Sequence, residues 1–448
     1  MKAVRRWRQL LSTRRLGKAA EGGDLSPPRT EFARDYDRII FSSAFRRLQD
    51  KTQIFPLAKS DYVRTRLTHS LEVASVGRSL GMLAAEVVLR QAPELSEVVI
   101  PQDVGTLVAA ACLAHDIGNP PFGHAGEDAI REWFGRWPGL SGLNEDQRRD
   151  LLEFEGNAQG FRTLCVLQNP GQPGGMQMTC AMLATMMKYP RPAAAGEAQK
   201  QGASGRKYGF FTSEAAWFAQ VAETAGLLPK PGGKPAWYRH PLAFLVEAAD
   251  DICYHVIDIE DGFKTGVLDF ATLYQLHEPF LEARHRRRLD CLPDHSQRAS
   301  YCRSVTIDHV VRQVIAVFDA HYEGIMAGCF DAPLLEHIEL AGAFARFKQV
   351  AETQVYYARP VVEVKACGFE VIAGLLDAFV EAIEDRAAKG SRASSRSRTL
   401  LQLMPRPLPD LAVLSPYQRI LLATDFVAGM TDSYAVELYQ RIRGIALP

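Results

Sequence analysis

The sequence predicts an all-α fold, built as one elaborated helical domain. Apolar residues recur at helical spacing along most of the chain, as they do between Leu67 and Val87, and this period marks one face of a helix. Alternating runs typical of strands are scarce. Stretches rich in Pro, Gly, Ser or charge interrupt the pattern but are short enough to be loops. They fall at residues 19–29, 117–123, 168–176, 190–206, 228–236, 284–300 and 389–409.

Length and composition narrow the functional class. With 448 residues, 47% of them hydrophobic, the chain can bury a large core. Lys plus Arg and Asp plus Glu both number 52, so no overall charge attracts the chain to nucleic acid or to a membrane. The eight cysteines form no C-x-x-C pair, which argues against a disulfide framework and favours a cytoplasmic location. The longest apolar runs are shorter than the roughly 20 residues that span a bilayer, so no membrane segment is expected.

The N-terminal segment, residues 1–28, is strongly basic. Its first 20 residues carry seven Lys or Arg and no acid. No apolar stretch or cleavage site follows, as a targeting signal would require. We therefore expect a solvated basic arm, followed by a single domain over residues 29–448.

Three separated segments place metal-type ligands in helical contexts. They carry His69, the adjacent His115 and Asp116, and Asp250. Two imidazoles and two carboxylates suit a divalent ion such as Mn, Fe, Co or Zn, and Mg less comfortably. The His115-Asp116 pair alone is more typical of an ordinary helix end with Gly118 as its cap. If the four ligands converge, they define a metal-ligand core at about residues 60–265, with a helical C-terminal part at about 266–448.

Just beyond these ligands, His124 and Glu127 stand at i, i+3 spacing in a segment expected to be helical. Residues at this spacing share a helix face, so Glu127 could orient His124 and raise its basicity. A general acid or base working near neutral pH needs such a partner. The alternative is a histidine that caps or packs the helix.

Asp250, Tyr254 and Asp258 share one face of another expected helix. Arg66 lies three residues before His69, where its guanidinium could hold a phosphate beside the metal. No glycine-rich phosphate loop of the P-loop or Rossmann type is present, so phosphate must be held by metal and side chains. Further candidate cations, most of them expected to be surface charges, are Arg46, Arg47, Lys51, Arg64, Lys188 and Arg191.

The order of His69, His115-Asp116 and Asp250 resembles the H…HD…D signature of the HD superfamily. Longer segments resemble the bacterial dGTPase-like triphosphohydrolases, and they run from residue 29 almost to the C-terminus. They are residues 29–38, 45–53, HDIGNPPFGHAGE at 115–127, FEGNAQGFR at 154–162, Lys188-Tyr189-Pro190, YGFFTSE at 208–214, EAADDICYHVIDIEDG at 247–262 and GMTDSYAVELYQRI at 429–442.

This resemblance implies an HD-domain helical core elaborated by additional helices, and a divalent metal (Mn, Mg, Fe or Co) on His69, His115, Asp116 and Asp250. It also implies the roles of six further residues. Arg66 would contact the α-phosphate, Gln53 the 3′-hydroxyl or nearby sugar and base edge, Tyr254 the sugar and Asp258 the 3′-hydroxyl, while His124 and Glu127 would form the catalytic pair.

The function that the resemblance implies is metal-dependent hydrolysis of deoxynucleoside triphosphates, dGTP among them, to deoxynucleoside and inorganic triphosphate. A homo-oligomer is expected, and an allosteric nucleotide or single-stranded DNA is a further candidate partner. Two alternatives stay open: an HD-type nucleotidase or phosphodiesterase, and a non-catalytic regulator that senses dNTPs. Release of inorganic triphosphate would distinguish the triphosphohydrolase from both alternatives.

Overall fold

The computed structural model describes residues 2–18, 29–54 and 64–446, which form twenty α-helices. Extended pairing among the described residues is limited to isolated bridges, so the prediction of an all-α fold is confirmed. The helices are α1 (Lys2–Leu10), α2 (Glu31–Phe41), α3 (Ser43–Arg47), α4 (Arg66–Gln91), α5 (Pro101–Ala114), α6 (His124–Arg136), α7 (Glu145–Leu152), α8 (Gly156–Arg162), α9 (Cys180–Met186), α10 (Ala215–Thr224), α11 (Ala243–Lys264), α12 (Phe270–His277), α13 (Ala283–Asp290), α14 (His295–Ala320), α15 (Tyr322–Ala327), α16 (Ala341–Val350), α17 (Arg359–Lys389), α18 (Ser395–Leu401), α19 (Pro416–Ala428) and α20 (Asp432–Arg443).

Helices α4, α5 and α11 pack against one another and form the centre of the fold. α4 begins at a capping box, in which the Thr65 side chain accepts from the Thr68 N–H and the Thr68 side chain accepts from the Thr65 N–H. α5 is buried along almost its whole second half, which explains its unbroken apolar run. α4 and α5 approach so closely that a Cβ at Gly81 would lie 2.9 Å from the Gly105 Cα. Only a residue without a side chain fits there.

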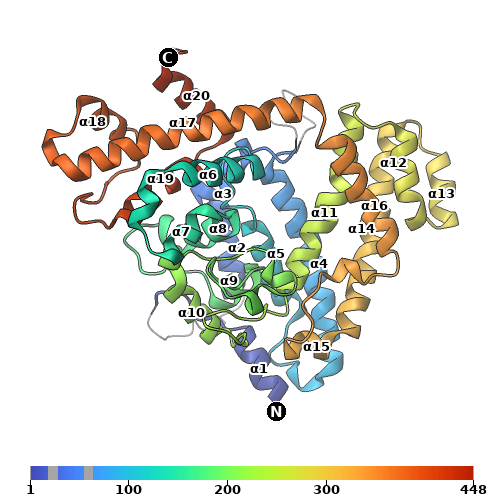
Figure 1. The fold of residues 1–448 in the computed structure, drawn as a ribbon. Helices are drawn as coiled ribbons and strands as arrows, with labels where there is room; N and C mark the ends of the chain where they lie inside the picture. Colours follow the sequence, from blue (N-terminus) through green and yellow to red (C-terminus); the bar gives the residue numbers. More distant parts are fainter. Residues whose placement is uncertain (1, 19–28, 55–63, 447–448) are drawn as a thin grey trace.

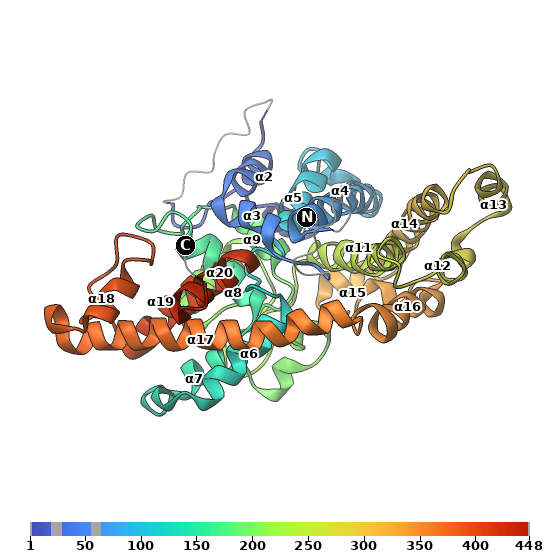
Figure 2. The same ribbon diagram turned by 90° about the horizontal axis from the view of Figure 1, so that it is seen from above.

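A second group of helices packs along α17, the long helix that crosses the molecule in Figure 1. α6, α18, α19 and α20 contact it, and Figure 2 shows α19 and α20 beside α17. The buried apolar residues of this group form a hydrophobic cluster separate from the one around α4, α5 and α11. The expected division of the chain near residue 265 therefore does not follow the packing. α6 packs with the C-terminal helices, whereas α14 and α16 pack on α11.

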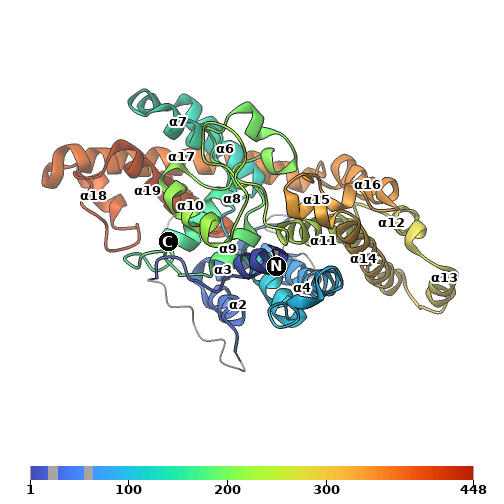
Figure 3. The same ribbon diagram turned by 90° about the horizontal axis from the view of Figure 1, so that it is seen from below.

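The helices that carry the expected ligands thus belong to one hydrophobic cluster, and α6 belongs to the other. The short turn 115–123 joins the end of α5 to the start of α6. Helices α12, α13, α14 and α16 lie together at one end of the molecule (Figure 3). A site that uses both α6 and the central helices must lie at the junction of the two clusters.

The N-terminal segment differs from the solvated arm that its charge predicted. Within the described residues 2–18, Trp7 and Leu16 are fully buried, and the Trp7 indole N–H donates to the Tyr322 hydroxyl at 2.8 Å. Arg15 forms ion pairs with Glu31 and with Asp35. The segment is therefore part of the core, and residues 19–28 lie outside the described residues. Among the described helices, none is long and apolar enough to cross a membrane.

Candidate active site

A cavity of about 940 Å³ opens at the junction of the two clusters. Nine of the ten site residues expected from the sequence line it, and they come from segments far apart in the chain. These nine are Gln53, Arg66, His69, His115, Asp116, His124, Glu127, Asp250 and Tyr254. The exception is Asp258, which is 1% exposed and does not line the cavity.

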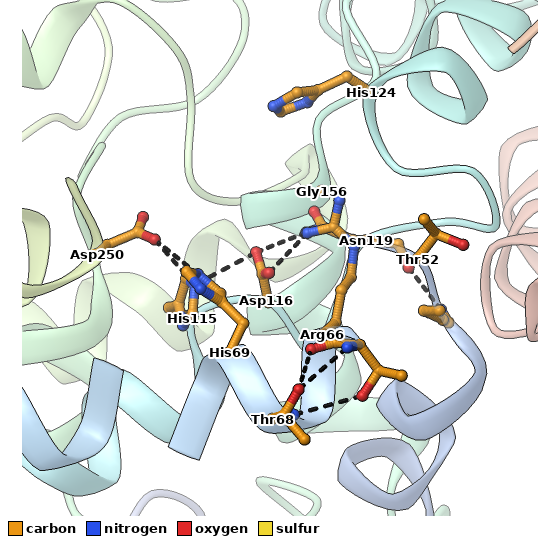
Figure 4. A network of polar contacts seen from close by, with 12 residues as sticks. Thr52, Arg66, Thr68, His69, His115, Asp116, Asn119, His124, Gly156 and Asp250 are labelled. Carbon is orange, nitrogen blue, oxygen red and sulfur yellow. Dashed lines mark hydrogen bonds and ion pairs between the residues drawn. The ribbon is translucent and has the colours of Figure 1, made fainter. Parts of the chain in front are cut away.

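Three of the expected metal ligands meet at one point of this cavity (Figure 4). Asp250 Oδ1 lies 3.2 Å from His69 Nε2 and 3.3 Å from His115 Nε2. Asp116 Oδ1 lies 3.5 Å from the same His115 nitrogen. Ligand atoms bound to one ion at about 2.0–2.2 Å stand roughly 3 Å apart, so the separations among His69, His115 and Asp250 suit a shared ion. Asp116, the fourth expected ligand, lies beside His115 but outside this group of three.

The chemistry of His115 supports the fit to a metal. Its Nδ1 lies 2.6 Å from the Cys112 carbonyl oxygen, and a carbonyl can only accept, so Nδ1 carries the proton. In the neutral imidazole, Nε2 then presents a lone pair toward the carboxylates. This nitrogen is buried without a hydrogen-bond partner in the described structure. A neutral imidazole oriented through its other nitrogen is the usual form of a histidine ligand.

Fixed cations accompany both carboxylates of the cluster. Arg66 Nη1 donates to Asp116 Oδ2 at 2.6 Å, and Lys188 Nζ donates to Asp250 Oδ2. Burial acts to raise the pKa of Asp116, but His115 and Arg66 outweigh it and hold that pKa below its usual range. Burial is likewise outweighed at Asp250, where Lys188 and His115 hold the pKa well below the usual value. Both groups are therefore carboxylates, the form that binds metal.

His124 stands apart from the ligand cluster in Figure 4. Its Nδ1 lies 3.1 Å from Glu127 Oε2, and its side chain is 70% exposed. Glu127 is buried, and its Oε1 accepts from the Gly156 N–H at 2.8 Å. Burial acts to raise the pKa of Glu127, but its hydrogen bond and ion pair with His124 lower it. The pair is thus a fixed carboxylate that orients an accessible imidazole.

An aromatic wall borders the cavity on the α11 side. Tyr254 and Tyr356 both line the cavity, with ring centroids 5.9 Å apart. The Tyr356 hydroxyl donates to Asp258 Oδ2. The structure therefore places Tyr356 in contact with the carboxylate that was expected to meet a substrate hydroxyl.

Several lysines that line the cavity were not predicted from the sequence. Of the six further candidate cations that the sequence offered, only Lys188 lines the cavity. Lys207, Lys348 and Lys365 line it as well, and they were not considered. Lys207 immediately precedes the YGFFTSE segment, which was the one local signal available. Lys348 and Lys365 lie on α16 and α17 and carry no such signal.

The helical core and the ligand cluster define an HD-domain protein. Residues 66–150 match the HD domain family, and they contain His69, His115, Asp116 and the His124–Glu127 pair. Asp250 lies beyond the matched residues, on α11.

Comparison with related sequences is more specific. The chain is 42% identical to a deoxyguanosinetriphosphate triphosphohydrolase-like protein of Synechocystis, over 98% of this chain and 100% of that protein. It is 38% identical to a protein of the same description from Pseudomonas aeruginosa, over 99% of both chains. A deoxyguanosinetriphosphate triphosphohydrolase of Klebsiella pneumoniae is 33% identical, over 94% of this chain and 96% of that enzyme. The chain belongs to the deoxyguanosinetriphosphate triphosphohydrolase family, and the predictions of this family and of an enzyme are confirmed.

Proposed function

We propose that the protein hydrolyses deoxynucleoside triphosphates, with dGTP as an expected substrate, to deoxynucleoside and inorganic triphosphate, and that it requires a divalent metal ion. One observation carries the proposal: a single cavity brings together the ligand cluster, the His124–Glu127 pair and six Lys or Arg side chains. The cations that line it are Arg66, Lys188, Arg206, Lys207, Lys348 and Lys365. A triphosphate needs several such partners, because each charged oxygen loses water on binding.

His69, His115, Asp116 and Asp250 would hold the ion. When bound, a divalent ion supplies positive charge and Lewis acidity next to a substrate phosphate. Arg66 already contacts Asp116, so its guanidinium is positioned to bind the phosphate nearest the ligands. The lysines would bind the outer phosphates, and Tyr254 would pack on the sugar.

The proposed reaction is an in-line attack of water on the α-phosphorus. A bond forms between the water oxygen and phosphorus, and the bond from phosphorus to the 5′-oxygen breaks. His124, with Nδ1–H donated to Glu127, would deliver a proton from Nε2 to the departing 5′-oxygen and recover one from the water. General acid catalysis of this kind contributes about 10²- to 10⁴-fold.

Selection of the sugar would rest on Tyr254 and Tyr356. A 2′-hydroxyl pressed against an aromatic ring would lose its water without gaining a partner. The proposed contact of Asp258 with the 3′-hydroxyl is supported less directly, since Tyr356 already donates to that carboxylate. Asp258 would contact the substrate only if the hydrogen bond from the Tyr356 hydroxyl breaks.

The test is to incubate the purified protein with each dNTP in the presence of Mn²⁺, Mg²⁺ or Co²⁺ and to measure inorganic triphosphate. Release of triphosphate together with the deoxynucleoside is expected. Release of orthophosphate from monophosphates alone would point to a nucleotidase, and binding without hydrolysis would point to a regulator. A homo-oligomeric state, an allosteric nucleotide or single-stranded DNA partner and a cytoplasmic location stay predictions of the sequence.

A further inference from the structure

The segment GMTDSY near the C-terminus has no role in the chemistry described above, yet it reaches the cavity wall. Asp432, the first residue of α20, is 1% exposed. Its Oδ1 accepts from the Phe122 N–H at 2.9 Å, and its Oδ2 accepts from the Thr52 N–H at 3.0 Å. One buried carboxylate therefore binds the backbone of two segments that are 310 and 380 positions away in the chain.

Both of these segments carry cavity residues. Thr52 precedes Gln53, and Phe122 lies two residues before His124. The segment that contains Thr52 also pairs with the start of α4 through a bridge between Thr52 and Thr65. Asp432 is thus bonded to the backbone directly before Gln53, a residue expected to contact the sugar. It is also bonded to the backbone two residues before His124, the proposed general acid.

Lys51 makes a second connection at the same junction. It is 3% exposed, and its Nζ donates to the carbonyl oxygens of Asn119 and of Ala428, the latter at 3.0 Å. Asn119 in turn donates through Nδ2 to Asp116 Oδ1 at 2.6 Å. The segments 51–52, 119–122 and 428–432 therefore meet in one hydrogen-bonded junction, which we call the C-terminal clamp.

The turn that the clamp holds has an unfavourable backbone conformation. Phe122 has a φ of +64°, and the following Gly123 has a φ of +57°. A residue with a side chain rarely adopts such a φ and keeps it only where its surroundings demand it. The ring of Phe122 packs against Gly368 of α17, where a Cβ would approach to 3.0 Å. A bond to its N–H and contacts to its ring thus restrain the same residue.

We infer that Asp432 is a positioning residue for catalysis, which holds the turn before His124 in the conformation that directs the imidazole into the cavity. This inference rests on the proposed function. It gives α20, near the C-terminus, a role in the active site. Loss of the Asp432 carboxylate would then disturb the orientation of His124 rather than the metal ligands. Displacement of a catalytic group by about 1 Å can cost roughly 100-fold in rate.

The test compares Asp432→Asn with Ser433→Ala. Asparagine has nearly the same shape but only one acceptor oxygen, so it can satisfy one of the two N–H groups and turns its own NH₂ toward the other. Ser433 donates to Asp50 Oδ1 at 2.9 Å, so the control removes a bond between neighbouring parts of the same segments without touching the turn. Asp432→Glu retains both acceptor oxygens and serves as the conservative variant.

Two readouts separate positioning from general stability. In Asp432→Asn, amide hydrogen exchange should accelerate in peptides that cover 119–126, and kcat for dNTP hydrolysis should fall at least tenfold, by more than any rise in KM. Metal stoichiometry should match the wild type. Ser433→Ala should change neither readout by more than about twofold, and Asp432→Glu should recover part of the lost protection and rate.

Unchanged exchange at 119–126 in Asp432→Asn would overturn the inference, and so would a loss of kcat no larger than that of Ser433→Ala. If Asp432→Asn does not fold, the same comparison is made with Asp432→Glu, whose longer side chain must shift the turn or the helix. If the wild-type protein hydrolyses no dNTP, the proposed function fails instead, and the exchange measurement still decides whether the clamp holds the turn.

Discussion

Lys188 and Asp250 are paired so that the carboxylate presents its free oxygen to the histidines. Lys188 Nζ donates to Asp250 Oδ2, while Oδ1 faces His69 and His115. The ammonium group thus fixes the orientation of the carboxylate and offsets part of its burial cost. As a ligand, Asp250 would join α11 to the segments that carry His69 and His115.

Replacement of Asp250 by Ala should therefore remove the metal. The variant loses the oxygen that both imidazoles face and leaves Lys188 buried without its partner. We expect less than about 10% of the wild-type metal content by elemental analysis and a loss of activity of about 10³-fold or more. Asp251→Asn is the matched control, since Asp251 also lines the cavity but is not in the ligand cluster. A full metal content in Asp250→Ala would contradict its assignment as a ligand.

Replacement of His124 by Ala should abolish turnover and leave the metal in place. His124 contacts Glu127 and none of the clustered ligands, so its loss removes a proton donor but no ligand. We expect kcat to fall by about 10²- to 10⁴-fold, measured as triphosphate release at saturating substrate. Glu127→Gln should lower kcat less, because the imidazole stays in place but loses its charged partner. Normal turnover in His124→Ala would exclude this histidine as the general acid.

Local spacing predicted the parts of the site that lie close together in the chain. His124 and Glu127 are three residues apart on a helix, and the structure joins them at 3.1 Å. The sequence could not place Tyr356 against Asp258, or Asp432 against Phe122, because these contacts join segments whose approach depends on the packing of whole helices. The helical period predicts which residues share a face, but not which face meets which.

In the N-terminal segment, the high charge drew attention away from the apolar face of a helix. Its charge predicted a solvated arm, yet Trp7 and Leu10 stand at i, i+3 spacing and are both buried. On α1 the arginines Arg5 and Arg8 are exposed while Trp7 enters the core. A short amphipathic helix has both properties, so the count of charges alone was a poor guide to its burial.

Replacement of Lys207 by Ala should weaken binding of the triphosphate more than binding of a monophosphate. Lys207 lines the cavity and lies 3.1 Å from Glu155, so the substrate would have to compete with that carboxylate for it. We expect KM for dNTP to rise about tenfold, or ~1.4 kcal/mol, and the inhibition constant of the corresponding dNMP to change less. Lys234→Ala is the control, since Lys234 also pairs with an acid, Asp146, but does not line the cavity. Equal effects on both nucleotides would indicate that Lys207 does not bind the outer phosphates.

Asp150 predicts a dependence of stability on pH that is independent of catalysis. It is fully buried, and its Oδ2 accepts from the Thr212 N–H at 2.7 Å and from the Tyr417 hydroxyl. Its Oδ1 has no hydrogen-bond partner among the described residues. Burial raises the pKa of Asp150 to about 7 from a usual value of 3.8. Between these two values the folded protein holds a proton that the unfolded chain has released. The free energy of unfolding should therefore decrease as the pH rises from about 4 to about 7, by up to ~1.4 kcal/mol per pH unit from this group.

Asp150→Asn should remove this dependence. The amide oxygen can still accept from Thr212 and Tyr417, and the NH₂ group takes the place of the oxygen that has no partner. We expect the variant to gain stability relative to the wild type at pH 8, where the wild-type protein must bury a charge, and to gain less at pH 5. The measurement is denaturant unfolding of both proteins across this range, with triphosphate release at each pH to show that the cavity is intact. A constant difference in stability between pH 5 and pH 8 would mean that the Asp150 carboxyl does not take up a proton on folding.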